Sequence, residues 1–290
     1  MIALFITILN MSITASIVAL AVMLVRIPFR KVPKIFSYIL WGAVLFRLVF
    51  PFSIESAFSL MPVFTNTISQ EMIFSQFHAI QPSDIFIKNT LPMIENGINS
   101  ASTILQVASL TWFCGFVVLL LYGIVGYISL KRRVYFATLL YKNVFQTDKI
   151  KAPFVLGLIR PNIYFPISID SSQHDYILKH EQTHIKRRDY LIKPFAYMIL
   201  AMHWFNPLIW LSYFLMSKDM EMSCDEVVLR KTNKDIRKDY SMSLLNLSIK
   251  NNNLLSPIVF AFGESNVKER VKNVLNFKKK IKNGYVLFPV

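Results

Sequence analysis

Two histidines and a glutamate lie within five residues of one another in the stretch KHEQTHIKRRDY, which covers residues 179 to 190. His180 and His184 are about one helical turn apart, so on a helix both project from the same face and can share a single tetrahedral ion. Glu181 follows the first histidine, where its carboxylate can take a proton from a metal-bound water. This H-E-x-x-H order is the zinc pattern of metallopeptidases, and it predicts a Zn2+ site with hydrolytic chemistry.

A catalytic zinc site needs a third protein ligand and an open position for water. The downstream stretch SKDMEMSCDEVVLRK predicts a helix that presents Glu221 and Asp225 on one face, four residues apart. We expect Glu221 to be the third ligand and Asp225 to accept a hydrogen bond from a ligand imidazole, which would fix its tautomer. The alternative is that the histidines are surface residues on a basic helix and that the two carboxylates belong to a solvated acidic face.

The group that would stabilise the oxyanion of a tetrahedral intermediate is left open by the sequence. His203 is one candidate, although its neighbour Trp204 is more typical of a residue at a membrane interface. Tyr190 and Tyr240 are equal alternatives. Cys224 lies beside the acidic pair, where we expect a small packed residue on the inner helix face rather than a reactive thiol.

The H-E-x-x-H motif needs a helix, and the stretch SIDSSQHDYILKHEQTHIKRRD contains the signals for one. Ser172 and Asp175 resemble a capping box at its start, and isoleucine and leucine residues give it an apolar side. Just before it, APFVLGLIRPNIYFP contains two β-rich stretches around Arg160 to Asn162. We expect these stretches to form a hairpin or a pair of short strands in a small sheet.

Three long apolar runs indicate an integral membrane protein. Hydrophobic residues make up 54% of the 290 residues, and the mean hydropathy is positive. At 1.5 Å per residue, about 20 apolar residues cross a hydrocarbon core of about 30 Å. The runs at 2–25, 35–52 and 104–130 are therefore expected to be three transmembrane helices.

The positive charges near these runs predict the orientation in the membrane. Four lysines and arginines lie between residues 26 and 34, and KRR follows the third run at 131–133. Because such residues are retained on the cytoplasmic side, the more acidic segment 53–103 is expected to face outward. The N-terminus is then outside the cell, and everything after residue 130 begins in the cytoplasm.

The apolar segment 191–216 is interrupted by two prolines, a histidine and an asparagine. We expect a buried or membrane-surface helical hairpin here, because an interrupted run rich in Trp and Tyr suits the interface. A further span would also place Glu221 on the opposite side of the membrane from His180.

The expected fold is mainly α-helical, with three N-terminal transmembrane helices followed by a cytoplasmic α+β zincin-like metallopeptidase domain. Its parts are a membrane region at 1–130 with the outer loop at 53–103, a peptidase domain at 131–265 that includes the segment 191–216, and a basic tail at 266–290. The formal net charge is +15, most of it in the second half, but no module that reads nucleic acid accompanies it. We therefore expect contact with membrane lipid and no direct binding of nucleic acid.

Five strings occur in order along the chain: PFVLGLIRPNIYFP, HEQTHIKRRD, HWFNPLIWL, EMSCDE and NVKERVKNVL. In this order, behind the apolar runs, they resemble the BlaR/MecR family of β-lactam sensor-transducer zinc metallopeptidases, which are of the gluzincin type. The family's H-E-x-x-H and downstream E-x-x-x-D fall here on His180, Glu181, His184, Glu221 and Asp225. The resemblance implies a cytoplasmic catalytic domain, signal-driven cleavage of a cytoplasmic transcriptional repressor, and self-cleavage in the segment that leads to a fourth span.

The sequence departs from the full-length sensors at its C-terminal end. It stops at Val290 with no fourth span and no extracellular penicillin-binding domain, so we expect a sensorless member of the family or a truncation. An S-x-x-K string from Ser265 to Lys268 lacks the S-D-N and K-T-G companions of penicillin-binding sites and is expected to be coincidental.

The leading hypothesis is a membrane zinc endopeptidase that cuts a cytoplasmic protein, by resemblance a winged-helix repressor in an antibiotic response. One alternative is a housekeeping gluzincin that degrades damaged membrane proteins. Another is a folded remnant in which zinc has a structural role. The substrate, the activating signal and a homodimeric state are left open.

Overall fold

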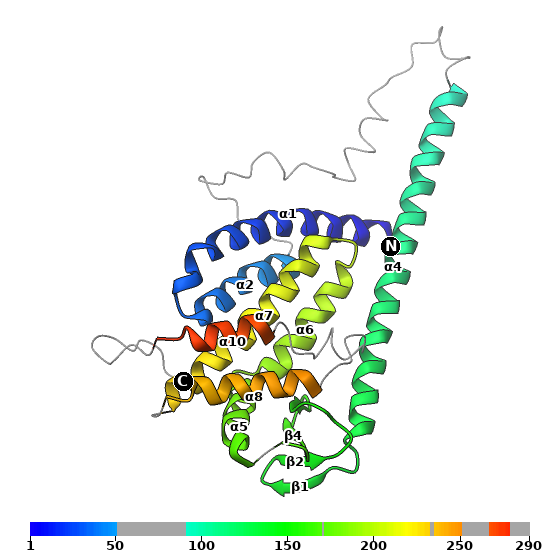
Figure 1. The fold of residues 1–290 in the computed structure, drawn as a ribbon. Helices are drawn as coiled ribbons and strands as arrows, with labels where there is room; N and C mark the ends of the chain where they lie inside the picture. The colour runs from blue at the N-terminus through cyan, green and yellow to red at the C-terminus, as the bar shows by residue number, and fades with distance from the viewer. Residues whose placement is uncertain (51–90, 170, 233–234, 251–266, 279–290) are drawn as a thin grey trace. The chain divides into compact units, whose positions relative to one another are not determined.

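The computed structural model describes residues 1–50, 91–169, 171–232, 235–250 and 267–278 (Figure 1). These residues are mainly helical, with one small sheet, as expected. In chain order the elements are the helix α1 (Ile2–Arg26), a short 3-10 helix (Pro28–Lys31), α2 (Lys34–Val49), α4 (Leu91–Arg133), the strands β1 (Thr138–Tyr141), β2 (Val144–Thr147), β3 (Phe154–Leu156) and β4 (Asn162–Pro166), and the helices α5 (Ser171–Lys186), α6 (Asp189–Met202), α7 (Pro207–Lys231), α8 (Arg237–Lys250) and α10 (Val267–Leu275).

The chain divides into two compact units. The first contains residues 1–29, 39–125 and 195–214, and the second contains residues 30–38, 126–194 and 215–290. The two motif histidines and the three motif carboxylates belong to the second unit. The domain boundaries expected from the sequence stay a prediction.

Two of the described helices are long and apolar enough to cross a membrane. They are Ile2–Arg26 and the Thr103–Arg133 part of α4. The remaining span expected from the sequence, at 35–52, corresponds to α2, which has 16 residues and ends at Val49. A helix of that length covers about 24 Å, less than a hydrocarbon core of about 30 Å, so the expectation of three spans is met only in part.

Helix α4 is longer than the span expected at 104–130. It begins at Leu91 and has 43 residues, so it includes the end of the segment 53–103 that we expect to be an outer loop. Residues 53–90 of that loop lie outside the described part of the chain. Hydropathy indicates only the apolar part of α4, because the polar residues of ENGINSAST lower the hydropathy without breaking the helix.

In the first unit, an asparagine joins α1 to the turn between α6 and α7. The Asn206 amide donates to Ser12 Oγ at 2.8 Å and to Ser16 Oγ at 2.7 Å. Its Oδ1 accepts a hydrogen bond from Leu208 N at 2.9 Å and so caps the start of α7. The interruption of the apolar segment 191–216 is therefore a boundary between two helices.

The sheet has the strand order β1-β2-β4-β3. β2 and β4 are parallel, and β1 and β3 pair with them antiparallel on the two sides. β3 and β4 are the two β-rich stretches expected from the sequence, and they form a hairpin. The sequence does not predict β1 and β2, because each has only four residues. In addition, the turn between them has Lys142 at φ 45° and lacks the glycine that is typical of such turns.

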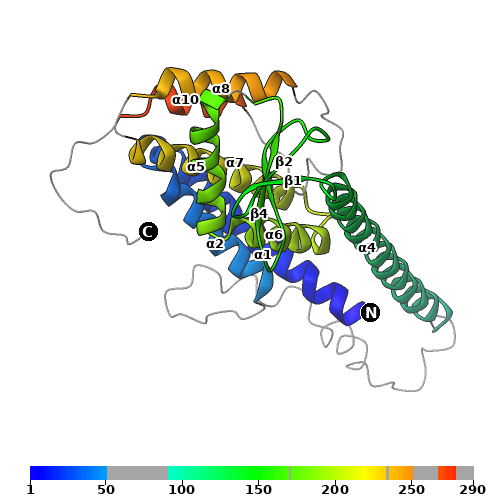
Figure 2. The same ribbon diagram turned by 90° about the horizontal axis from the view of Figure 1, so that it is seen from below.

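Clusters of buried apolar side chains hold the second unit together. One joins the sheet to α5 and α8 and contains Val144, Ile163, Phe165, Ile169, Ile177 and Leu247. Another joins α7, α8 and α10 and contains Val228, Leu229, Ile236, Tyr240, Leu244 and Val274. Helices α8 and α10 lie side by side in both views (Figure 1, Figure 2). This packing brings four helices, α5, α7, α8 and α10, around one buried polar cluster.

Candidate metal centre

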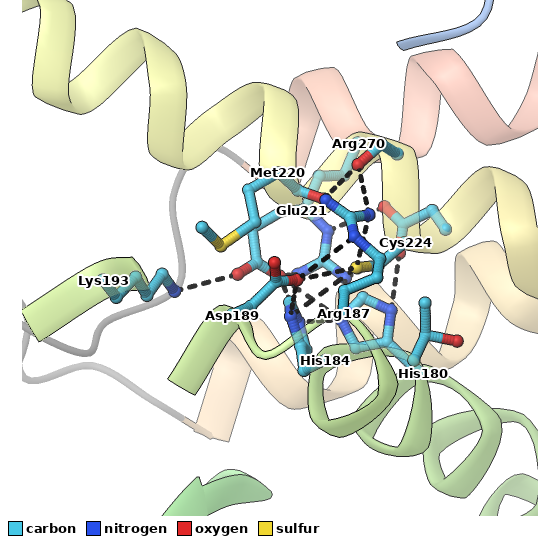
Figure 3. Close-up of polar contacts among 12 residues, drawn as sticks. His180, His184, Arg187, Asp189, Lys193, Met220, Glu221, Cys224 and Arg270 are labelled. Atoms are coloured by element: carbon cyan, nitrogen blue, oxygen red, sulfur yellow. Dashed lines mark hydrogen bonds and ion pairs between the residues drawn. The ribbon is translucent and has the colours of Figure 1, made fainter. Parts of the chain in front are cut away.

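His180 and His184 on α5 face Glu221 on α7 in this buried cluster (Figure 3). The Nε2 atoms of the two histidines are 3.1 Å apart, and Glu221 Oε2 lies 3.3 Å from His180 Nε2 and 3.6 Å from His184 Nε2. Ligand atoms about 2.0 to 2.2 Å from one tetrahedral ion lie roughly 3.3 to 3.6 Å apart. The three side chains therefore fit a zinc ion, and two imidazoles with one carboxylate are a donor set that zinc accepts.

The helical periodicity of α5 and α7 determines which side chains of this cluster share a helix face. The rings of His180 and His184 project from one face of α5, edge to face, with centroids 4.8 Å apart. Glu221 and Asp225 share a face of α7 in the same way. The spacing in the sequence predicts which side chains share a face, and the packing of the second unit then brings the two faces together.

Asp225 contacts the opposite side of the His180 ring. Its Oδ1 lies 3.1 Å from His180 Nδ1, which is the position expected of a carboxylate that fixes the imidazole tautomer. The Tyr240 hydroxyl donates to the same oxygen at 2.6 Å. With a proton on Nδ1, the lone pair of His180 is on Nε2, which faces Glu221. The Tyr240 hydroxyl is thus hydrogen-bonded to Asp225 on the Nδ1 side of the His180 ring, away from the metal position. This argues against the oxyanion role considered for Tyr240.

Asp189 has the equivalent contact with His184, and the sequence alone does not indicate it. Its Oδ2 lies 2.8 Å from His184 Nδ1, and its Oδ1 accepts a hydrogen bond from the Tyr38 hydroxyl at 3.2 Å. Asp189 begins α6, after Arg188 in the left-handed region at φ 60°. The available signal is an aspartate just beyond the end of the motif helix, where a sharp turn can bring it back to the last histidine.

Two cations from α6 and α10 also reach the cluster. Lys193 Nζ lies 3.0 Å from Glu221 Oε1. The Arg270 guanidinium donates to both carboxylate oxygens of Asp225, at 2.8 and 2.9 Å, and Arg270 is only 1% exposed. Neither cation stands out in the sequence, because Lys193 lies in an apolar run and Arg270 lies among other charged residues.

The pKa values of the two histidines are raised. Burial lowers the pKa of His180, but hydrogen bonds to Asp225 and Glu221 outweigh burial and raise this pKa to about 9. Burial also lowers the pKa of His184, yet its neighbours, Cys224 first and Glu221 next, raise it well above its ordinary value. These shifts favour protonated imidazoles, so a metal ion bound by the two Nε2 atoms would have to displace protons.

The pKa values of Glu221 and Asp225 are lowered. Burial raises the pKa of Glu221, but Lys193 and then His184 outweigh burial and hold this pKa well below its ordinary value. Burial likewise raises the pKa of Asp225, and the adjacent Arg270 guanidinium more than compensates. Both groups are therefore carboxylates at neutral pH, the form that binds a cation or orients an imidazole.

A pocket opens beside the cluster. It is lined by both motif histidines, by Glu181 and Glu221, and by β3 with the turn that follows it, residues 154–158. Glu181 is 5% exposed and borders the same space as the candidate metal ligands. A carboxylate in this position can accept a proton from a water molecule that occupies the pocket.

The remaining residues weighed from the sequence differ in their surroundings. Tyr190 lines the pocket and stays a candidate for oxyanion stabilisation. His203 belongs to the first unit, where its Nδ1 donates to Ile199 O at 3.0 Å. Cys224 is fully buried, as expected of a packed residue, and accepts a hydrogen bond from Arg187 Nη1 at 3.2 Å.

One known protein family matches this sequence over most of its length. The family model described as BlaR1 peptidase M56 matches residues 6–274. The chain belongs to this peptidase family. Membership confirms the resemblance to the BlaR/MecR proteins that the sequence motifs indicate.

Individual M56 relatives match a shorter region. The regulatory protein BlaR1 of Bacillus licheniformis is 36% identical over 135 residues, which are 44% of this chain and 22% of that protein. The methicillin resistance mecR1 proteins of Staphylococcus aureus (strain Mu50) and Staphylococcus epidermidis are 32% identical over 136 residues, which are 44% of this chain and 23% of each relative. The chain thus spans less than a quarter of the length of these relatives.

Proposed function

We propose that the chain is a membrane-bound zinc endopeptidase whose metal is held by His180, His184 and Glu221. The observation that carries this proposal is that three candidate ligand atoms converge beside a pocket. The two Nε2 atoms are 3.1 Å apart, and Glu221 Oε2 lies 3.3 Å from His180 Nε2 and 3.6 Å from His184 Nε2. Membership of the M56 peptidase family supports it. When bound, the ion would supply Lewis-acid chemistry, polarising the scissile carbonyl and activating a water.

Glu181 is the general base in this proposal. Its carboxylate borders the pocket next to His180 and is not among the three converging ligands. It accepts a proton from the attacking water and passes a proton to the amine of the departing peptide. Asp225 and Asp189 hold the Nδ1 sides of the two imidazoles, so that both Nε2 atoms stay directed at the metal position.

The proposed substrate is an extended segment of a protein. β3 forms one side of the sheet and also lines the pocket. The outward N–H and C=O groups of such an edge strand can pair with another extended chain. A peptide added alongside β3 would pass the three candidate ligands, which favours endopeptidase cleavage of a flexible region.

The proposed substrate is also cytoplasmic and regulatory. KRR at 131–133 ends α4, a candidate span, and such residues are retained on the cytoplasmic side. Apart from Tyr127, the residues that line the pocket follow this cluster along the chain. The relatives named regulatory protein BlaR1 and methicillin resistance mecR1 protein favour a transcriptional repressor in an antibiotic response, with self-cleavage as a second reaction of the same site.

Replacement of Glu181 by Gln tests the mechanism. Because Glu181 is a base and not a ligand, Glu181→Gln should keep one zinc per chain while cleavage falls by about 10²- to 10⁴-fold. The assay uses the full-length protein in membranes, a co-expressed candidate repressor or the chain's own 265–285 segment as substrate, and zinc analysis of the same samples. The control is Gln182→Ala, at an exposed neighbouring position of α5, which should cleave like wild type.

Wild-type cleavage by a zinc-loaded Glu181→Gln protein would refute this mechanism. A zinc-loaded wild type that cleaves neither substrate would favour a structural role for the metal.

A further inference from the structure

Arg270 reaches the metal centre from a helix that carries none of the motif residues. It lies on α10, 45 residues after Asp225, and is 1% exposed. Its Nε donates to Asp225 Oδ2 at 2.9 Å and its Nη2 donates to Asp225 Oδ1 at 2.8 Å. Two parallel bonds of this kind fix the plane of a carboxylate as well as its position.

The carboxylate that Arg270 fixes is the one that touches a candidate ligand. Asp225 Oδ1 lies 3.1 Å from His180 Nδ1, and the Tyr240 hydroxyl donates to the same oxygen. Arg270 Nη1 also lies 3.4 Å from Glu221 Oε2. Arg270, Asp225 and His180 thus form a continuous line of contacts that ends at the metal position.

The position of α10 is set by apolar packing. Val274 is fully buried in the cluster that joins α7, α8 and α10, and Val267 and Val271 pack against that cluster. This anchoring directs Arg270 inward, whereas Lys272 on the same helix is exposed. The helix therefore presents Arg270 to the site and its two lysines, Lys268 and Lys272, to solvent.

We propose that Arg270 is a positioning residue of the metal centre. Its guanidinium holds Asp225 in the orientation that keeps a proton on His180 Nδ1 and directs Nε2 toward the ion. This role rests on the proposed function, because it concerns the same zinc site. A lysine cannot replace the arginine fully, since an ammonium offers no planar fork to the carboxylate.

Zinc affinity of the full-length protein in detergent tests the proposal. Metal-free protein is titrated with zinc against a chromophoric chelator, for Arg270→Gln, Asp225→Asn, the double variant and the control Lys272→Gln. We expect Arg270→Gln to weaken zinc binding by about 10- to 100-fold and Asp225→Asn to do the same. Lys272→Gln, which removes an exposed cation from the same helix, should bind zinc like wild type.

The double variant separates positioning from a merely structural role. Because Arg270 acts mainly through Asp225, Arg270→Gln should change zinc affinity several-fold less once Asp225 is Asn than when Asp225 is intact. An equal loss in both backgrounds, or wild-type affinity in the Arg270→Gln single variant, would overturn the positioning role.

If Arg270→Gln does not fold, Arg270→Lys replaces it in the test, because a lysine can still pair with the buried carboxylate of Asp225. It should weaken zinc binding measurably in the wild-type background and several-fold less in the Asp225→Asn background, and any other pattern overturns the role. A wild-type protein that binds no zinc would instead overturn the proposed function and, with it, this inference.

Discussion

The His184 imidazole is held on both sides. Its Nε2 faces His180 and Glu221, and its Nδ1 lies 2.8 Å from Asp189 Oδ2. We expect Asp189→Asn to weaken zinc affinity by about 10- to 100-fold, because an amide can no longer hold the same tautomer. Cleavage should recover when zinc is in excess. Chelator competition and a cleavage assay at two zinc concentrations measure both effects.

The matched control for this variant is Asp175→Asn. Asp175 lies on the same helix as His184, but its side chain is 66% exposed and pairs with Lys179. An exposed pair of this kind contributes little, so zinc affinity should stay at the wild-type value. Equal losses in both variants would show that Asp189 has no special relation to the metal.

Protons and zinc compete for the same two imidazoles. The pKa of His180 is raised from 6.5 to about 9, so its protonated form stabilises the metal-free fold below pH 6.5. That stability, about 3 kcal/mol for this nearly buried group, is lost as pH rises through 9. The melting temperature of chelator-treated protein should therefore fall between pH 6.5 and 9, as scanning calorimetry would show. Zinc-loaded protein should lack this fall, and the same fall with zinc bound would contradict the assignment of His180 as a ligand.

At the residue scale, sequence spacing predicts only part of the cluster. The four-residue intervals predict that His180 faces the same way as His184, and Glu221 the same way as Asp225, and the structure brings all four together. Asp189 and Arg270 lie inside the strings HEQTHIKRRD and NVKERVKNVL, but their roles could not be predicted, because their contacts depend on a sharp turn and on the packing of α10.

At the scale of elements, the hairpin of β3 and β4 depends on one glycine. Gly157 has φ +117°, and a Cβ added there would lie 2.3 Å from Arg160 O. We expect Gly157→Ala to lower the free energy of unfolding by about 1 to 3 kcal/mol and to distort the wall of the pocket. Cleavage should fall while zinc content stays unchanged, because the candidate ligands lie on α5 and α7. Thermal unfolding, metal analysis and a cleavage assay on the same protein test this.

The control is Gly42→Ala on α2, where a Cβ meets no atom within 4 Å. In a helix, Ala is favoured over Gly, so this change should leave stability equal or slightly higher. Normal cleavage by Gly157→Ala would mean that β3 does not bind the substrate.

The elements predicted best are those with a strong local pattern. The motif helix carries an apolar pattern and the two strands around Arg160 carry β-forming residues, and all three occur where expected, although the helix begins at Ser171, before the expected cap Ser172. Helix ends in the apolar N-terminal part of the chain are predicted poorly, because hydropathy measures compatibility with lipid and not the hydrogen bonding of the backbone. Hence α4 extends to Leu91 and α2 stops at Val49.

At the scale of the whole molecule, the side of the membrane on which the pocket lies decides which proteins can be substrates. The positive clusters at 26–34 and 131–133 predict that both are cytoplasmic. A reporter enzyme that is active only outside the cytoplasm should therefore work when fused near Asp84 and fail when fused near Thr147. The opposite result would place the metal centre outside the cell and exclude a repressor as substrate.

Asp225 is held by a residue of a helix that lies later in the chain. The metal centre is therefore completed in steps while the chain is synthesised. Arg270 is made 45 residues after its partner, a delay of about 2 to 9 s at about 5 to 20 residues per second. During this interval a ribosome-bound chain already contains every proposed zinc ligand but lacks the arginine that aligns one of them. The ability to cut protein would then develop only after Arg270 has been made, so a nascent chain that ends before Arg270 would spare the newly made proteins around it.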